Sequence, residues 1–108
     1  MSKRFGQIIG VSPGQFERYR TYKNAVWEEV LNALKAYNIK EYTIFCRGGY
    51  LYAYFEYTGN DFCADISKMA SDQITAEWWK LLKPMQQPMV TEKKEEWWTN
   101  MEIIFNLD

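Results

Sequence analysis

The apolar positions divide the chain into strand-like and helix-like stretches. Residues Arg4 to Val11 are apolar and β-branched enough to predict a first strand. Ser12 and Pro13 then provide an N-cap and a proline suited to the first helical position, so a helix is expected to begin there. From Phe16 to Tyr37 apolar residues recur with helical spacing, which predicts one long amphipathic helix that ends near Asn38.

Two strand-like runs follow, joined through a pair of glycines. Lys40 to Cys46 and Tyr50 to Tyr57 flank Gly48-Gly49, and glycine adopts the positive φ angles of a tight hairpin turn without strain. The runs therefore predict an antiparallel hairpin. The two faces of its second strand carry Tyr50, Tyr52, Tyr54 and Glu56 on one side and Leu51, Ala53, Phe55 and Tyr57 on the other. Neither face is expected to be freely solvated.

The remaining third of the chain alternates between helical and strand-like spacing. A helical repeat that follows Asn60 and a second one from Thr75 to Leu82 predict two short helices or one broken helix. Pro84 to Glu96 has no periodicity and is typical of a loop. Met101 to Leu107 alternates well enough to predict a last strand.

The resulting order, β-α-β-β-α-β, predicts an α+β fold of the ferredoxin-like type, a four-stranded antiparallel sheet with helices on one face. The other face carries many aromatic side chains and is expected to be covered. Monomers seldom expose large apolar patches, so two subunits are expected to bring their sheets together or to enclose a ligand pocket. With 108 residues, the chain has room for a single domain spanning residues 1–108.

Composition narrows the functional classes. Thirteen basic and fourteen acidic residues give a net charge of -1, which argues against nucleic acid and against an anionic membrane as partners. No apolar run is long enough for a signal peptide or a membrane span, so a cytoplasmic location is expected. Cys46 and Cys63 lack CxxC spacing, which fits a reducing compartment and predicts two core thiols.

The chain contains no histidine, which removes the commonest general acid or base near neutral pH and the commonest zinc ligand. It also lacks a phosphate-binding glycine loop, a zinc-ligand spacing and a nucleophile elbow. Any catalysis is therefore expected to use carboxylates, tyrosine, lysine, cysteine or the backbone.

Lys23 lies near the centre of the apolar stripe of the first predicted helix, between Tyr19 and Trp27. A charge on a buried face costs free energy unless it reaches water, pairs with a carboxylate or serves a ligand. The simplest alternative is that the aliphatic part of Lys23 packs on the apolar face while its ammonium reaches water at the sheet edge. Glu56 and Glu102 each lie within a strand of otherwise apolar residues, so either is a candidate partner for Lys23.

Tyr19, Lys23 and Trp27 follow the spacing i, i+4, i+8, which places a phenol, an ammonium and an indole on one helix face. Aromatic rings pack against the C–H faces of a sugar, while the phenol and ammonium hydrogen-bond its oxygens. The set therefore suits a neutral polyol, although aromatic residues on an apolar helix face usually belong to the core.

Adjacent tryptophans occur twice, as Trp78-Trp79 and as Trp97-Trp98. Two neighbouring rings cannot both point into one core from a regular helix, so one ring of each pair is expected to face a groove, an interface or solvent. A groove is favoured for the first pair. The second pair is equally compatible with a lid, a dimer contact or a hydrophobic plug.

With these residues in view, the chain resembles the L-rhamnose mutarotase family across nearly its full length. The resemblance rests on four stretches: Tyr19-(three residues)-Lys23-Asn24-Ala25-Val26-Trp27, Tyr42-Thr43-Ile44-Phe45, Tyr50 to Tyr57, and Trp78-Trp79. The stretch from Tyr54 to Tyr57 that runs into Asp61-Phe62 is similar to the branch associated with L-fucose.

The resemblance implies a dimeric α/β barrel that interconverts the α and β anomers of 6-deoxy-hexoses, without cofactor or metal. It implies an isomerase, an aldose 1-epimerase (mutarotase) of carbohydrate metabolism, for a sugar such as L-rhamnose or L-fucose. It places Tyr19, Tyr42, Trp78 and Trp79 at the family's sugar-contacting positions. Lys23 matches the position where the family carries its proton-donating histidine.

Because lysine occupies this position, two alternatives to a working mutarotase remain open. Mutarotation needs a proton delivered to the ring oxygen, and an unperturbed lysine titrates near ~10.4, far from pH 7. Burial would lower that pKa toward neutrality, whereas a carboxylate partner would oppose the shift. The first alternative is a non-catalytic sugar-binding homologue. The second is another cofactor-free enzyme in which Lys23 forms a Schiff base with a carbonyl substrate.

Overall fold

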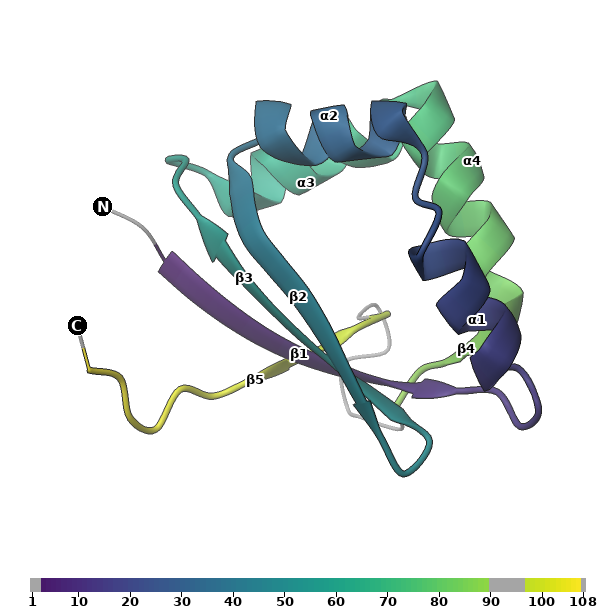
Figure 1. Cartoon of the computed structure of the whole chain (residues 1–108). Helices are drawn as coiled ribbons and strands as arrows, with labels where there is room; N and C mark the ends of the chain where they lie inside the picture. The colour runs from purple at the N-terminus through teal and green to yellow at the C-terminus, as the bar shows by residue number, and fades with distance from the viewer. Residues whose placement is uncertain (1–2, 90–96, 108) are drawn as a thin grey trace.

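The computed structural model describes residues 3–89 and 97–107. Within these residues, Figure 1 shows a curled antiparallel sheet with the helices on one side of it. The elements run in the order β1 (Lys3–Val11), α1 (Phe16–Lys23), α2 (Glu28–Ala36), β2 (Ile39–Arg47), β3 (Tyr50–Tyr57), α3 (Phe62–Ser71), α4 (Gln73–Leu82), a 3-10 turn (Lys83–Met85), β4 (Gln86–Gln87) and β5 (Thr99–Met101).

The strands follow the spatial order β2-β3-β1-β4, and β5 also pairs with β1. Every pairing is antiparallel, and the β1–β3 ladder runs from Lys3 opposite Tyr57 to Gly10 opposite Tyr50. The predicted α+β, ferredoxin-like arrangement with its one-sided helical cover is therefore confirmed, but the sheet has five strands among the described residues where four were predicted.

The predicted hairpin is also confirmed. Gly48 and Gly49 have φ angles of 61° and 83°, so both occupy the left-handed region that a two-residue turn of this hand requires. Burial alternates along β3 as the sequence pattern predicts. The buried, helix-facing side chains are Leu51, Ala53, Phe55 and Tyr57.

Strand β2 contains a β-bulge that the sequence analysis did not predict. Between Lys40 and Thr43 it has one residue more than β3, so Glu41 and Tyr42 together face Phe55. Glu41 absorbs the extra length in a left-handed conformation with φ 54°. A one-residue shift reverses the alternation of the strand, so Tyr42 and the even-numbered residues after it face the helices.

The prediction of one helix from Phe16 to Tyr37 is wrong, because the chain forms two helices that meet at an angle (Figure 1). Helix α1 ends at Lys23, and Trp27 has an extended backbone as the N-cap of α2. The break lets the helical layer follow the curl of the sheet. The predicted start at Ser12 and Pro13 is also wrong, since the helix begins at Phe16.

Helices α3 and α4 confirm the prediction of two short helices. The side chain of Asp61 accepts a hydrogen bond from the backbone N–H of Ala64 (3.1 Å), and Asp72 accepts one from Thr75 (2.9 Å). These are N-caps, which stabilise helix starts by satisfying an otherwise unpaired donor. The hydroxyl and the backbone N–H of Thr75 together lower the pKa of Asp72.

The end of the chain departs from the prediction. Residues 83–87 form a 3-10 turn and the short strand β4, where a loop was predicted, and residues 90–96 of that predicted loop lie outside the described residues. The strand predicted for Met101 to Leu107 is wrong, because β5 covers Thr99–Met101 and residues 102–107 form no strand. Ile104 is 91% exposed.

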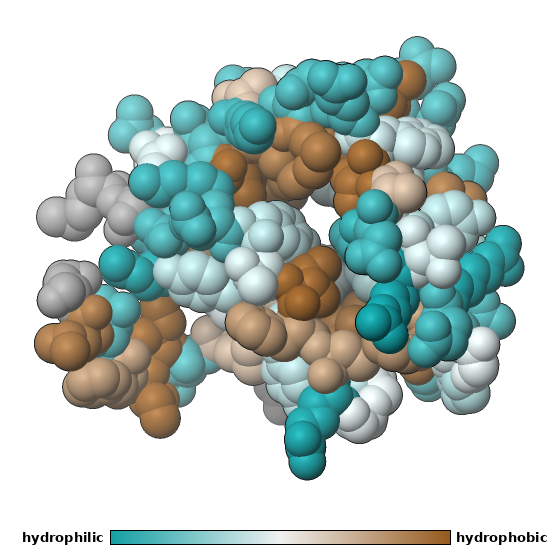
Figure 2. Space-filling model, in the orientation of Figure 1, coloured by the Kyte–Doolittle hydropathy of each residue, from teal (hydrophilic) through white to brown (hydrophobic). Residues whose placement is uncertain are grey.

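The buried apolar residues form two clusters between the sheet and the helices. The larger comprises Ile9, Val11, Tyr19, Val30, Leu51, Trp78, Leu82 and Met85. The smaller comprises Ile39, Phe55, Tyr57 and Met69, with Phe5 and Phe62 packed against it. Figure 2 shows the molecule hollowed between the helices and the sheet. Among the described residues, no helix is long and apolar enough to cross a membrane.

Candidate active site

The hollow contains a cavity of about 460 Å³ enclosed by α1, α2, α4 and the inner face of β2 and β3. Its wall does not include Trp27, but it includes the residues that the family resemblance placed at catalytic or sugar-contacting positions: Tyr19, Lys23, Tyr42, Trp78 and Trp79. These residues come from three separate elements. The structure thus brings the predicted set together, while their roles remain a prediction.

Helix α1 supplies Tyr19 and Lys23 from consecutive turns, so both side chains face the sheet. The Nζ atom of Lys23 lies 5.7 Å from the centroid of the Tyr19 ring and 6.0 Å from that of Tyr42. Both distances are within the range of a cation–π contact. The ammonium is therefore held between two phenol rings inside the cavity.

No hydrogen bond or ion pair reaches the Lys23 ammonium from residues 3–89 or 97–107. Burial lowers the pKa of Lys23 to about 8, because protein surroundings solvate the charge less well than water does. At neutral pH the amine is thus close to its titration point. That is the property expected of an acid or base that works near pH 7.

Tyr19 is almost completely buried, and its hydroxyl is part of a hydrogen-bond chain that the sequence analysis missed. Trp97 Nε1 donates to Gln86 Oε1 (2.6 Å), and Gln86 Nε2 donates to the Tyr19 hydroxyl (3.2 Å). An indole N–H can only donate, which fixes the orientation of the Gln86 amide. The Tyr19 hydroxyl therefore accepts from Gln86 and keeps its own proton for another partner. Burial raises the pKa of Tyr19 to about 12.

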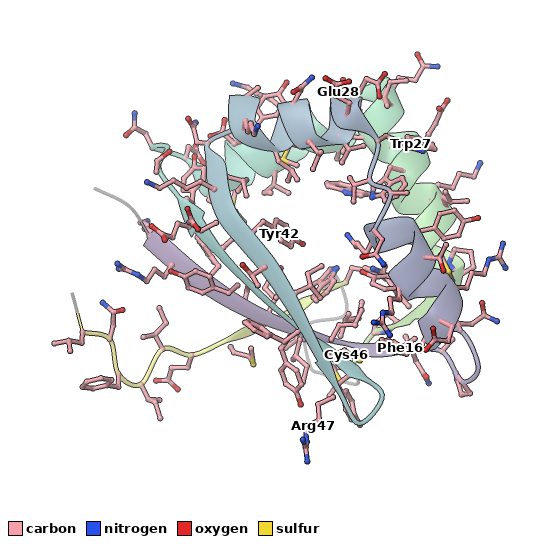
Figure 3. All side chains as sticks on the ribbon, viewed as in Figure 1. Phe16, Trp27, Glu28, Tyr42, Cys46 and Arg47 are labelled. Carbon is pink, nitrogen blue, oxygen red and sulfur yellow. The ribbon has the colours of Figure 1, made fainter. Side chains whose placement is uncertain are left out.

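Tyr42 projects from β2 into the space between the sheet and the helices (Figure 3). Its side chain is 38% exposed, yet the pKa of its phenol is raised above the usual range by burial and, secondarily, by the nearby Tyr19 phenol. The two observations differ because the exposed part of the ring faces the cavity and its mouth, whereas protein surrounds the hydroxyl. The phenol is therefore a neutral hydrogen-bonding group at pH 7.

The adjacent tryptophans of α4 have different surroundings. Trp78 is only 1% exposed and packs edge-on against Tyr22 and Trp27, with ring centroids 6.3 and 5.0 Å apart. Trp79 is half-buried and lines both this cavity and its neighbour. Trp27 does not share the helix face of Tyr19 and Lys23 as predicted, because the helix breaks before it.

A second cavity of about 310 Å³ adjoins the first, and both are lined by Lys23, Leu34, Tyr42 and Trp79. Trp97 and Trp98 lie in its wall, where the ammonium of Lys83 is 5.3 Å from the Trp97 ring. The second tryptophan pair is therefore packed beside the candidate site. No signal in the sequence tied these residues to Tyr19 through Gln86.

Three expectations about polar residues are wrong. Glu56 lies on the outer face of β3, where it accepts a hydrogen bond from the Tyr54 hydroxyl (3.2 Å), so it is not the partner of Lys23. Glu102 is exposed and lines neither cavity. Cys46 and Cys63 are exposed free thiols rather than core thiols. Among the described residues, no group of histidine, cysteine, aspartate and glutamate side chains is placed to hold a metal ion.

Fold and site together define an α+β protein whose curled sheet and helices enclose an aromatic cavity around one amine. A family model that describes L-rhamnose mutarotase matches residues 4–107. The chain belongs to the L-rhamnose mutarotase family.

The chain is also similar to individual proteins over most of its length. The L-rhamnose mutarotase of Oceanobacillus iheyensis is 29% identical over 108 residues, covering 98% of this chain and 99% of that protein. The UPF0734 protein of Dictyostelium discoideum is 34% identical over 98 residues, covering 85% and 78% of the two chains. The crystal structure of an L-rhamnose mutarotase from Formosa agariphila superposes with a TM-score of 0.77 at 21% identity, covering 98% and 99%. At that identity the superposition shows a shared fold.

Proposed function

We propose that the protein is an aldose 1-epimerase that interconverts the α and β anomers of a 6-deoxy-hexose such as L-rhamnose or L-fucose. The observation that carries the proposal is the position of Lys23, whose amine lies 5.7 and 6.0 Å from the ring centroids of Tyr19 and Tyr42 in the wall of an open cavity. Family membership supports the reaction type.

In the proposed reaction the Lys23 ammonium donates a proton to the ring oxygen while the anomeric hydroxyl loses one to water. The ring opens to the aldehyde, C1 rotates, and the hydroxyl recloses on the opposite face as the protons return. A pKa of about 8 suits this cycle, because both protonation states are populated near neutral pH. Tyr19 and Tyr42 serve as hydroxyl contacts that hold the sugar in place.

Trp78 and Trp79 complete the proposed sugar site. An aromatic face packs well against the C–H groups and the methyl of a 6-deoxy sugar. Because Trp78 is 1% exposed and Trp79 is half-buried, we assign the main stacking contact to Trp79 and a supporting position to Trp78. Trp79→Ala should weaken binding of L-rhamnose about tenfold in a fluorescence titration, and unchanged binding by a folded variant would refute the assignment.

A homodimer is part of the proposal. Phe45 is 60% exposed and lies on β2 with its side chain turned away from the cavity, and Tyr50 is 41% exposed on the outer face of β3. Ile104, Phe105 and Leu107 of the final segment are 80–91% exposed. Apolar area of this extent is usually covered by a partner. Sedimentation equilibrium should give the mass of two chains at micromolar concentration, and a monomer would contradict this part of the proposal.

A cytoplasmic location stays a prediction from the sequence.

The absence of histidine favours a second candidate, a sugar-binding homologue without catalysis. One NMR sample separates the two functions. Saturation-difference spectra with L-rhamnose and then L-fucose report binding, and magnetisation exchange between the α and β anomeric signals reports turnover. Exchange above the spontaneous rate supports the epimerase. Binding with only spontaneous exchange supports the binding homologue, and no binding of either sugar rejects both.

A further inference from the structure

We propose that the amine of Lys23 forms an imine with the open-chain aldehyde of the bound sugar. The inference rests on the proposed function, because it takes the open-chain sugar as the species presented to the amine. It adds a covalent intermediate to a reaction that otherwise needs only proton transfer.

The first argument is the absence of a competing partner. A buried lysine usually donates to a carboxylate, which keeps it charged and unreactive. Within residues 3–89 and 97–107, the Lys23 ammonium has no hydrogen-bond acceptor or carboxylate partner. Glu56, one of the two candidate partners named from the sequence, lies on the other face of the sheet. The nitrogen lone pair is therefore available to an electrophile once a proton leaves.

The second argument is access. Lys23 lines both the cavity of about 460 Å³ and its neighbour of about 310 Å³, so it lies where the two meet. The aromatic side chains around the amine remove part of its contact with water, and that favours the uncharged amine. The lowered pKa of Lys23 agrees with this environment.

The third argument is the pair of phenols beside the amine. The Tyr19 hydroxyl accepts a hydrogen bond from Gln86 and retains a proton, and the Tyr42 hydroxyl makes no hydrogen bond to the described residues. Both are neutral at pH 7, as phenols ordinarily are, and burial raises the pKa of each further. They are suited to hydrogen-bond the carbonyl oxygen as it gains charge.

The step balances without any further reactant. The amine lone pair attacks C1, a C–N bond forms, and the carbonyl electron pair moves to oxygen, which takes up the proton released by nitrogen. The carbinolamine then loses water and leaves a C1=N imine. Addition of water reverses both steps, returns the amine and releases an aldehyde that recloses to either anomer.

Reductive trapping tests the proposal. The full chain is incubated at pH 7 with L-rhamnose and sodium cyanoborohydride, and modified lysines are located by peptide mass spectrometry. The expected product is a secondary amine on Lys23, heavier by the mass of the sugar less one oxygen. About tenfold more of the amine is neutral for each unit by which a pKa is lowered, so trapping at Lys23 should exceed trapping at an exposed lysine about a hundredfold.

Lys80, on the exposed surface of α4, provides the matched control. Lys80→Arg should leave the yield unchanged, whereas Lys23→Arg should abolish the dominant adduct. Lys23→Met serves as a second variant should arginine disturb folding. An adduct spread evenly over the lysines, or no adduct at Lys23, overturns the proposal.

The proposal and the proposed function fail in distinguishable ways. Anomer exchange without a Lys23 adduct retains the epimerase and overturns the imine. A Lys23 adduct without exchange above the spontaneous rate supports the imine and rejects the epimerase.

Discussion

Two buried tyrosine clusters of this molecule differ in how their polar groups are satisfied. The Tyr57 hydroxyl donates to Asp65 and accepts from the backbone N–H of Asp61, while Asn38 donates to the same Asp65 carboxylate. In the second cluster, Tyr42 faces Lys23, and the phenol makes no hydrogen bond to the described residues. A buried polar group with partners stabilises a fold, whereas one that faces a cavity without them is available to a ligand.

Charge differs between the clusters as well. The hydrogen bond from Tyr57 lowers the pKa of Asp65, so the carboxylate stays ionised and is solvated by protein donors. Burial is the cause that lowers the pKa of Lys23, and no carboxylate among residues 3–89 and 97–107 offsets it. We call the first group the Tyr57 cluster (Asn38, Tyr57, Asp61 and Asp65) and the second the Lys23 cluster (Tyr19, Lys23 and Tyr42).

Phe55 lies between the two clusters, and its removal should have the largest effect on stability. Its ring stacks on Tyr42 at 5.5 Å between centroids. It also stacks at 5.8 Å on Phe62, whose ring packs edge-on against Tyr57 at 5.2 Å. Phe55→Ala should lower the free energy of unfolding by about 3–5 kcal/mol, because a large cavity forms in the core. Urea unfolding measures this. Ile74→Ala at an exposed site of α4 is the control, and an equal loss there would contradict a special role for Phe55.

Replacing Lys23 should stabilise the protein in a pH-dependent way. Below pH 8 the lysine is charged in both states, and only the folded state bears the cost of burying the charge. Between pH 8 and about 10.5 the folded state has released the proton while the unfolded state keeps it, so the cost disappears as pH rises. Lys23→Met should therefore be more stable than wild type by about 3 kcal/mol at pH 6.5.

The difference between the two proteins should shrink as pH rises through 8 and vanish above about 10.5. Urea unfolding at a series of pH values gives the difference directly. Tyr19, Tyr42 and Arg20 also line the cavity, and all three are retained in both proteins, so the comparison isolates Lys23. A difference that does not change with pH would show that the charge is not buried.

Tyr57→Phe tests the Tyr57 cluster. Removing the hydroxyl leaves the Asp61 N–H without its partner and the Asp65 carboxylate with Asn38 as its remaining side-chain donor, which destabilises the fold. We expect the melting temperature to fall by roughly 5–10 °C, with no change in anomer exchange. Scanning calorimetry and exchange NMR measure the two quantities. A loss of exchange at unchanged stability would place Tyr57 in the active site instead.

Of these variants, Glu41→Gly should have the smallest effect on stability. It should stabilise the fold, whereas Tyr57→Phe should destabilise it. Glycine adopts the left-handed conformation of the bulge without steric cost, whereas a glutamate at φ 54° is strained. The melting temperature should rise by about 2–4 °C, and exchange should persist because Tyr42 keeps its direction. Glu41→Val, which disfavours positive φ, should lower the melting temperature. A rise with valine would contradict the bulge as the feature that orients Tyr42.

Local signals account for most of what the sequence predicted correctly. The Gly48-Gly49 turn and the alternation of β3 each depend on neighbours along the chain. Lys23 could be singled out because a charge interrupts an apolar stripe within one helix. The single helix predicted from that stripe agrees with the structure only as far as Lys23, where α1 ends.

The features that the sequence did not predict depend on distant parts of the chain. The bulge at Glu41 is set by the register with β3, and the break before Trp27 follows the curl of the sheet. Gln86 contacts Tyr19 from 67 positions away, inside a stretch without periodicity. The sequence makes Glu56 and Glu102 candidate partners of Lys23 because each interrupts an apolar strand-like pattern, but that pattern does not show which face of the sheet meets the helices.

The most direct test of the central claim is anomer exchange of L-rhamnose, measured by NMR with wild type, Lys23→Met and Lys23→His in parallel. We predict exchange above the spontaneous rate for wild type and a loss of about 10²–10⁴-fold in the methionine variant, with binding retained. Histidine should keep or raise the rate, since it titrates nearer neutral pH. Wild-type exchange that survives Lys23→Met unchanged would contradict the account, because the reaction would then not depend on the amine between the two tyrosines.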